Sequence, residues 1–217
     1  MVSTAPIYSL ATEAQARAES NAWAQFSSPK DSTEFFASWL AILCAQINSV
    51  NGALLVLGDQ GGGYGAAAVW PDASRNMQYL GPAAERVLKE RRGLVLNPDG
   101  TEVSRPETPA HVGYPIEVSG MLRGAVVLDL PPSLDHDLQR ALRLLHWASA
   151  WMVDQFRQQE LMAQEGRVTR LSLATDLVAT AVKERRVGSS ALAVVNEIAV
   201  RLQCDRVSIG LEKAGSI

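Results

Sequence analysis

Five residues in the middle of the chain carry side chains that could bind a planar or anionic small molecule. Aromatic rings stack on flat ligands, and a guanidinium pairs with negative charge. We predict that they converge over one face of a sheet as a ligand pocket. The alternative is that the aromatic rings are core residues and the arginine is a solvated helix residue. The five are Trp70, Tyr79, Arg86, His111 and Tyr114.

The glycine-rich segment 61–65 has the composition of a phosphate-binding loop. Such loops lie between a strand and a helix whose N-terminus faces the anion. This segment leads instead into another apolar run, and no lysine follows it. We interpret it as the loop of a hairpin, with an anion site as the alternative.

The histidines and cysteines lack the spacing of a metal site or a catalytic site. His136 and His146 lie ten residues apart in one predicted helix, and Asp135-His136-Asp137 reads as a solvated helix start. Cys44 and Cys204 are unpaired in the sequence pattern, which fits a reducing cytoplasm. No Gly-x-Ser-x-Gly motif occurs. We predict a protein that is not an enzyme and binds no metal; the cofactor is unknown.

The composition is that of a globular chain, with 47% hydrophobic and 20% charged residues among 217. A net charge of −3 gives no reason to expect nucleic acid as a partner. No apolar run is long enough to span a membrane, and no signal-peptide pattern opens the chain. We predict a cytoplasmic location without membrane contact in these residues, in a longer protein that could be anchored downstream of Ile217.

The order of predicted elements indicates an α+β fold. Two hairpins follow one another, which favours an antiparallel sheet over alternating strands and helices. Amphipathic helices at 32–48 and 133–157 flank the hairpins, and we predict that both pack on the same face of the sheet. The first is expected to begin at Asp31 with Glu34 as an acidic capping box, and the second at a Ser133 cap. The predicted strands are 53–57, 66–70, 94–96, 112–118 and 121–130; a helix at 81–90, closed by Gly93, and a surface loop at 97–109 complete the domain.

A second copy of the opening helix and strand begins near Ser189. Leu43 matches Ile198 at an offset of 155 residues, and the same offset relates Leu40 to Val195 and Leu54 to Ile209. A period this long indicates tandem domains rather than a solenoid. We expect an N-terminal helical arm at 1–30, a domain at 31–157, a connecting helix at 158–188 ended by Gly188, and the truncated start of a second domain at 189–217. The strand of that second copy, 207–211, is expected to be poorly ordered or to pair with another chain.

Two segments of the first copy resemble the GAF family of small-molecule-sensing domains. They are the helix running into Gly52-Ala53-Leu54-Leu55-Val56-Leu57 and the late hairpin from His111 to Leu128, with Pro115-Ile116 before its turn and Gly124 before an aliphatic run. The resemblance implies a GAF-like antiparallel sheet with helices on one face and a long C-terminal connecting helix. It also implies a sensory or regulatory role in a tandem GAF region.

The resemblance does not specify a ligand. The Asn-Lys-Phe-Asp-Glu motif of many cyclic-nucleotide-binding GAF domains is absent, and neither cysteine lies in the pattern that attaches bilin in phytochromes. The phrases 115–118 and 145–148 are also similar to cytoplasmic regions of some bacterial secretion or efflux membrane-fusion adaptors.

The long helix from Ser133 carries more apolar surface than one sheet can cover. We therefore predict a parallel homodimer through the helices at 133–182. The expected function is a non-enzymatic sensory module of a larger bacterial signalling or transport-associated protein. It would bind an unidentified small molecule and signal through a helical dimer linker. The alternatives are a structural dimerisation platform without a ligand and an enzyme such as a free methionine sulfoxide reductase. The predicted interface residues are Leu145, Met152, Phe156, Leu171 and Val178.

Overall fold

The structure, a computed structural model, describes residues 7–47, 49–59, 61–102 and 108–210, with side chains described from Ala16 onward. The chain divides into two compact units, Met1–Phe156 and Arg157–Ile217. None of the helices in the described part of the chain combines the length and the apolar character needed to cross a membrane.

The first unit is built on a five-stranded sheet of order β2-β1-β5-β4-β3. Every neighbouring pair is antiparallel, which confirms the predicted sheet type. Ser119 and Gly120 join the last hairpin with positive φ angles of 52° and 79°, the conformation that a two-residue hairpin turn requires. The strands are β1 (Gly52–Gly58), β2 (Tyr64–Trp70), β3 (Leu94–Leu96), β4 (Ala110–Val118) and β5 (Met121–Leu130).

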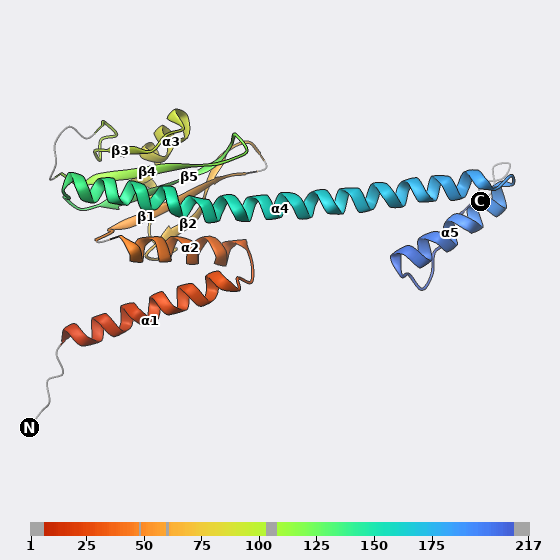
Figure 1. Cartoon of the computed structure of the whole chain (residues 1–217), viewed down its shortest axis with the longest axis horizontal. Coiled ribbons are helices and arrows are strands. Elements are labelled where there is room, and N and C mark those ends of the chain that lie inside the picture. Colours follow the sequence, from red (N-terminus) through yellow and green to blue (C-terminus); the bar gives the residue numbers. More distant parts are fainter. Residues whose placement is uncertain (1–6, 48, 60, 103–107, 211–217) are drawn as a thin grey trace, which may run out of the picture. The chain divides into compact units, whose positions relative to one another are not determined.

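Two helices cover the same face of this sheet, as the sequence predicts. They are α2 (Ser32–Gln46) and the first part of α4 (Asp135–Lys183). Leu40 of α2 and Leu145 of α4 are fully buried in one cluster with Leu55, Val112 and Leu128 of the sheet. In Figure 1, α2 and the first part of α4 run beside the strands. The side chains on this face form the larger core.

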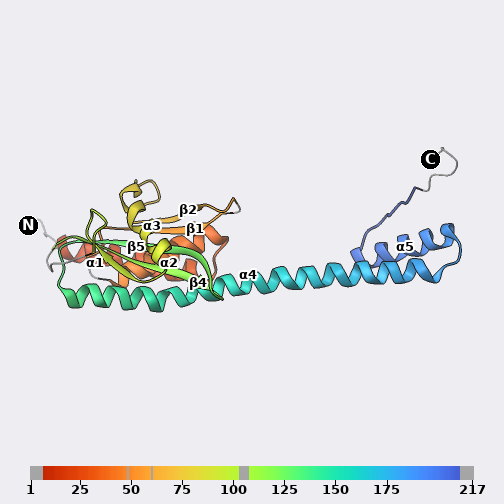
Figure 2. The same cartoon turned by 90° about the horizontal axis from the view of Figure 1, so that it is seen from above.

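The opposite face is also covered, by helices that the sequence pattern does not assign to it. The short helices η1 (Gln78–Leu80) and α3 (Gly81–Glu90) pack there, and both views place α3 across the sheet from α4 (Figure 2). Val87 is fully buried against this face, close to Gly113. A Cβ at Gly113 would lie 2.5 Å from Val87 Cγ2, so a residue without a side chain lets α3 approach the strand.

The expected N-terminal arm is a packed helix, α1 (Ile7–Ser27), within the first unit. Ala22 is buried, and the Phe26 ring stacks on Phe35 of α2 at 5.1 Å and meets Trp151 of α4 edge-on at 5.5 Å. Residues 11–25 are mostly polar, so the sequence pattern did not indicate that this helix packs on the domain. A few apolar residues near the end of α1 make these contacts.

Three predicted helix boundaries differ from the observed ones. The Ser133 hydroxyl donates to the carbonyl of Pro131 instead of capping α4, which begins at Asp135. Arg91, not Gly93, is the left-handed residue that ends α3. Gly188, expected to end the connecting helix, lies inside α5 (Val187–Leu202). The Asp31 cap of α2 is confirmed, since its carboxylate accepts from Glu34 N at 2.8 Å.

The second unit consists of the rest of α4 and the helix α5. α4 is continuous through Gly166. α5 lies along the end of α4 (Figure 2), where Ser190 Oγ donates to the Ala181 carbonyl and Arg201 pairs with Asp176, each at 2.9 Å. Within 207–210, the described part of the predicted second-copy strand, no strand forms; Leu211 lies outside the described residues.

Candidate functional site

Three polar side chains, Tyr79, His111 and Asp129, form a row on the α3-covered face of the sheet. His111 of β4 and Gly52 of β1 are the register partners of Asp129 on β5, and their alternation with core residues directs them to this face. Tyr79 of η1 lies over the row: its hydroxyl donates to Asp129 Oδ2 at 2.9 Å, and its ring centroid is 5.9 Å from that of His111. A Cβ at Gly52 would lie 2.7 Å from Met77 Cε and 3.1 Å from the Tyr79 oxygen, so glycine leaves room for both side chains.

The row is a poor centre for proton transfer at neutral pH. Burial lowers the pKa of His111, and the Asp129 carboxylate, 4.0 Å from His111 Nε2, opposes that shift only in part. The imidazole is therefore neutral at pH 7. Burial, reinforced by the hydrogen bond to Asp129, raises the pKa of Tyr79 to about 12. A neutral imidazole, a phenol and a carboxylate together offer hydrogen-bond donors and acceptors for a small polar molecule.

The structure brings together only two of the five predicted pocket residues, Tyr79 and His111. Arg86 lies on α3, where it donates to the Gly100 carbonyl and forms an ion pair with Glu90 at 2.7 Å. The guanidinium group of Arg86 is therefore already paired within the domain.

The other two predicted pocket residues lie on the opposite face of the sheet, among the larger core. Tyr114 packs against α4, with its hydroxyl 2.5 Å from His146 Nδ1. Trp70 packs against the same core at the end of β2. Sequence spacing missed Asp129, although its place opposite His111 follows from strand register.

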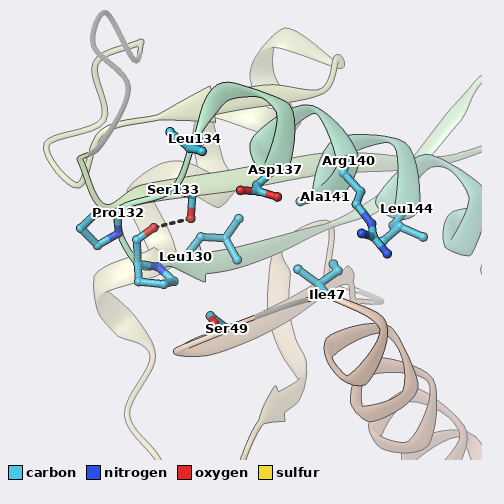
Figure 3. A pocket seen from close by; sticks show the side chains of 11 residues that line it. Ile47, Ser49, Leu130, Pro132, Ser133, Leu134, Asp137, Arg140, Ala141 and Leu144 are labelled. Carbon is cyan, nitrogen blue, oxygen red and sulfur yellow. Dashed lines mark hydrogen bonds between the residues drawn. The ribbon is translucent and has the colours of Figure 1, made fainter.

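A shallow pocket of about 260 Å³ opens where β5 runs into α4 (Figure 3). Ile47 and Leu130 line its inner wall, and Asp137 and Arg140 of α4 lie along its rim. Both charged side chains are at least partly solvent-exposed, so they are hydrated without a ligand. This pocket could not be predicted from sequence patterns, because its lining comes from the segment after α2, the end of β5, the following loop and α4.

The predicted dimer residues separate into two groups. Leu145 and Met152 are fully buried in the core of their own domain, and Phe156 is half-buried beside Phe36. Leu145 and Met152 are therefore unavailable to a partner, which corrects that part of the prediction. Leu171 and Val178, in the second unit, are 68% and 63% exposed.

The described residues were also considered for nucleophilic and metal chemistry. Cys44 is buried, and desolvation raises the pKa of its thiol far above the usual range, which disfavours the nucleophilic thiolate. Among the described residues, no three histidine, cysteine or carboxylate side chains group as metal ligands.

Comparisons with known proteins return structural likenesses only. No protein-family model matches the sequence, and no curated protein matches it. The GAF domain of an Acinetobacter phosphoenolpyruvate-protein phosphotransferase is 14% identical, with a TM-score of 0.49 over 69% of this chain and 97% of that one. The A. aeolicus nlh2 GAF domain in an inactive state is 12% identical, with a TM-score of 0.48 over 67% and 96%. The photosensory core module of Stigmatella aurantiaca phytochrome is 11% identical, with a TM-score of 0.47 over 91% of this chain and 46% of that one.

Proposed function

We propose that this chain is a non-enzymatic sensory module of the GAF type, from a larger bacterial signalling or transport-associated protein. It binds a small polar molecule at the Tyr79–His111–Asp129 row and transmits the bound state through a dimeric helix. The proposal rests on the sequence resemblance, on the antiparallel sheet with helices α2 and α4 on one face, and on the properties of α4.

The observation that carries the proposal is the dual character of α4. Its first part supplies the buried residues Leu138, Leu145 and Met152 to the core of the sensory domain. Its later part carries exposed apolar residues at heptad spacing: Leu161, Val168 and Val182 at one position and Leu171 and Val178 at the other. One helix thus belongs to the domain and also bears a stripe suited to pairing.

The α4 stripe, defined as Leu161, Val168, Leu171, Val178 and Val182, is distinct from the surface that α5 occupies. The polar contacts of α5 on α4 go to Asp176 and Ala181, neither of which belongs to the stripe. Each stripe residue is between 58% and 77% exposed. Burying such side chains stabilises an association by about 1.5–3 kcal/mol each, before the entropy of pairing is counted. A parallel two-stranded coiled coil accounts for the stripe.

The proposal is tested by measuring the mass of the purified chain in solution and identifying small molecules released from it. Sedimentation at micromolar concentration is expected to give a dimer that Leu171→Glu with Val178→Glu dissociates. Thr169→Glu, an exposed change between stripe positions, serves as the matched control. Mass spectrometry of the denatured protein is expected to detect a polar molecule that Tyr79→Phe and Asp129→Asn variants no longer retain. A protein that is monomeric at these concentrations contradicts the sensory proposal. A dimer from which no small molecule is released also contradicts it.

A structural dimerisation platform is the second candidate. This candidate is favoured because Arg86, Trp70 and Tyr114 already contact other residues of the domain, which leaves few groups for binding a ligand. A stable dimer that releases no small molecule and keeps its affinity in the Tyr79→Phe variant would favour the platform. A methionine sulfoxide reductase reading is weakened by the burial of Cys44.

A further inference from the structure

The pocket where β5 runs into α4 lies on the other side of the sheet from the Tyr79–His111–Asp129 row. Its volume is about 260 Å³, and we call it the α4 pocket (Figure 3). Its apolar wall consists of Ile47, Leu130 and Leu144, which belong to the larger core or pack against it. The α4 pocket is therefore separate from the row, which lies on the α3-covered face.

Two opposite charges lie one helical turn apart on the α4 pocket. Asp137 and Arg140 are three residues apart in α4, and both line the pocket. Their side chains extend from α4 on the side where Leu130 and Ile47 lie (Figure 3). Residues at this spacing are neighbours on a helix surface, where an aspartate and an arginine can pair.

The two charged side chains do not pair with each other. The ion-pair contact of the Asp137 carboxylate is with His136, whose Nε2 lies 3.3 Å from Oδ1. Within the described part of the chain, the Arg140 guanidinium has neither a hydrogen bond nor an ion pair. The pocket thus presents one anion and one cation that are both able to accept a further partner.

The surface between the two charges is apolar. Leu130 and Ala141 are almost completely buried, at 2% and 1% exposed. The hydroxyl of Ser133, also in the lining, already donates to the Pro131 carbonyl. Small-molecule sites commonly combine such an apolar wall with a few polar groups that fix the orientation of the ligand.

We propose that the α4 pocket binds a small zwitterion, an α-amino acid with an aliphatic side chain. The ligand carboxylate pairs with the Arg140 guanidinium, whose planar fork matches a carboxylate. The ligand ammonium pairs with Asp137, and the aliphatic side chain covers Leu130 and Ile47. Pockets for drug-sized ligands have volumes of about 300–1,000 Å³, so this smaller pocket suits a ligand of amino-acid size.

A zwitterion accounts for the pocket better than a simple anion or cation. Asp137 and Arg140 are at least partly solvent-exposed, and a single exposed ion pair contributes little to binding. A ligand that carries both charges forms two ion pairs but loses its translational freedom only once. Such a ligand would also connect the start of α4 to the end of β5, where Leu130 lies.

The test is a titration of the full chain with L-leucine, followed by calorimetry and by the amide NMR signals of residues 130–144. We expect saturable shifts at the pocket, with a dissociation constant of about 1 mM because exposed charges contribute little each. Isocaproate is leucine without the ammonium, and isoamylamine is leucine without the carboxylate. Each is expected to bind at least about tenfold more weakly, since each loses one charge-assisted contact.

Matched variants distinguish the pocket from the general charge of the helix. Arg140→Gln and Asp137→Asn are each expected to weaken leucine binding by at least about tenfold. Arg143→Gln and Asp135→Asn remove exposed charges of the same helix that do not line the pocket. These controls should change the affinity by less than about twofold. Far-ultraviolet circular dichroism establishes that all four variants remain folded.

The other outcomes overturn the inference without touching the proposed function. Absence of shifts at the pocket with L-leucine rejects the site, and equal binding of leucine and isocaproate rejects the role of Asp137. Shifts confined to residues around Tyr79 and His111 would assign leucine to the row instead. Tyr79→Phe is expected to leave leucine binding at the α4 pocket unchanged, so a loss there would also overturn the inference.

Discussion

Helices α2 and α5 carry nearly the same apolar pattern but lie in different surroundings. Leu40 and Leu43 of α2 are 0% and 3% exposed, whereas their counterparts Val195 and Ile198 of α5 are only half-buried. α2 packs on a five-stranded sheet, while the described partner of α5 is one other helix. An amphipathic pattern is therefore enough to form a helix, but the partner determines how much of its apolar face is buried.

The difference has an energetic consequence. A sheet removes a whole stripe from water, whereas a single helix covers a narrow part of it. Most of the stability of a short helix comes from that burial. The first unit should therefore respond strongly to changes in its core, and the second should respond weakly.

The largest expected effect is the contrast between Leu40→Ala and Val195→Ala. Leu40 is fully buried, so its truncation should lower the free energy of unfolding of the first unit by about 2–5 kcal/mol. Val195→Ala should cost the second unit less than about 1 kcal/mol. Urea denaturation, with hydrogen exchange of α2 and α5 amides followed separately, measures both. Equal losses would mean that α5 is as fully packed as α2.

Gly124→Ala should be the next largest change. A Cβ at this position in β5 would lie 2.1 Å from the Val56 carbonyl oxygen, which is backbone of the neighbouring strand and cannot rotate away. We expect a loss of about 1–3 kcal/mol in the first unit, measured by thermal or urea unfolding. A variant of unchanged stability would show that β1 and β5 can separate locally without cost, and would weaken the contrast between the units.

The pH response of the first unit should depend on His111. Because burial holds its pKa below the ordinary value of 6.5, the unfolded chain binds more protons than the folded one in that window. Stability should thus fall as the pH drops from about 6.5 toward the folded pKa, with a slope of up to ~1.4 kcal/mol per pH unit. His111→Gln should flatten this slope. His136→Gln, at a side chain 73% exposed, is the control and should leave it unchanged.

Gly166→Ala should give the smallest effect, and one of opposite sign. The position lies inside α4, and the nearest atom to a new Cβ would be Arg170 Nη2 at 4.0 Å. Alanine should stabilise the helix by about 0.5–1 kcal/mol. Increased amide protection around residue 166 would be the readout. A loss of helicity there would indicate that the glycine serves a bend or a close contact in the dimer.

Much of the fold follows from local patterns in the sequence. The β4–β5 hairpin is predictable because Ser119-Gly120 is a short turn between two apolar runs. The position of α2 and α4 on one face follows from their apolar stripes. The candidate site is less predictable: of its members, Tyr79 and His111 were expected together, but Trp70 and Tyr114 lie on the other face. Spacing along the chain says nothing about which residues strand register and helix packing bring side by side.

The five strands of the first unit, their antiparallel pairing and helices α2 and α3 follow from the sequence, because periodicity and turn residues act over a few positions. Which apolar residues remain exposed depends on tertiary packing, which local patterns do not specify. Leu145 and Trp147 are two residues apart in one helix, yet the first is fully buried in the core and the second is 73% exposed. Two residues correspond to a turn of about 200° around a helix, so the sheet and α2 can cover one side chain while the other faces solvent.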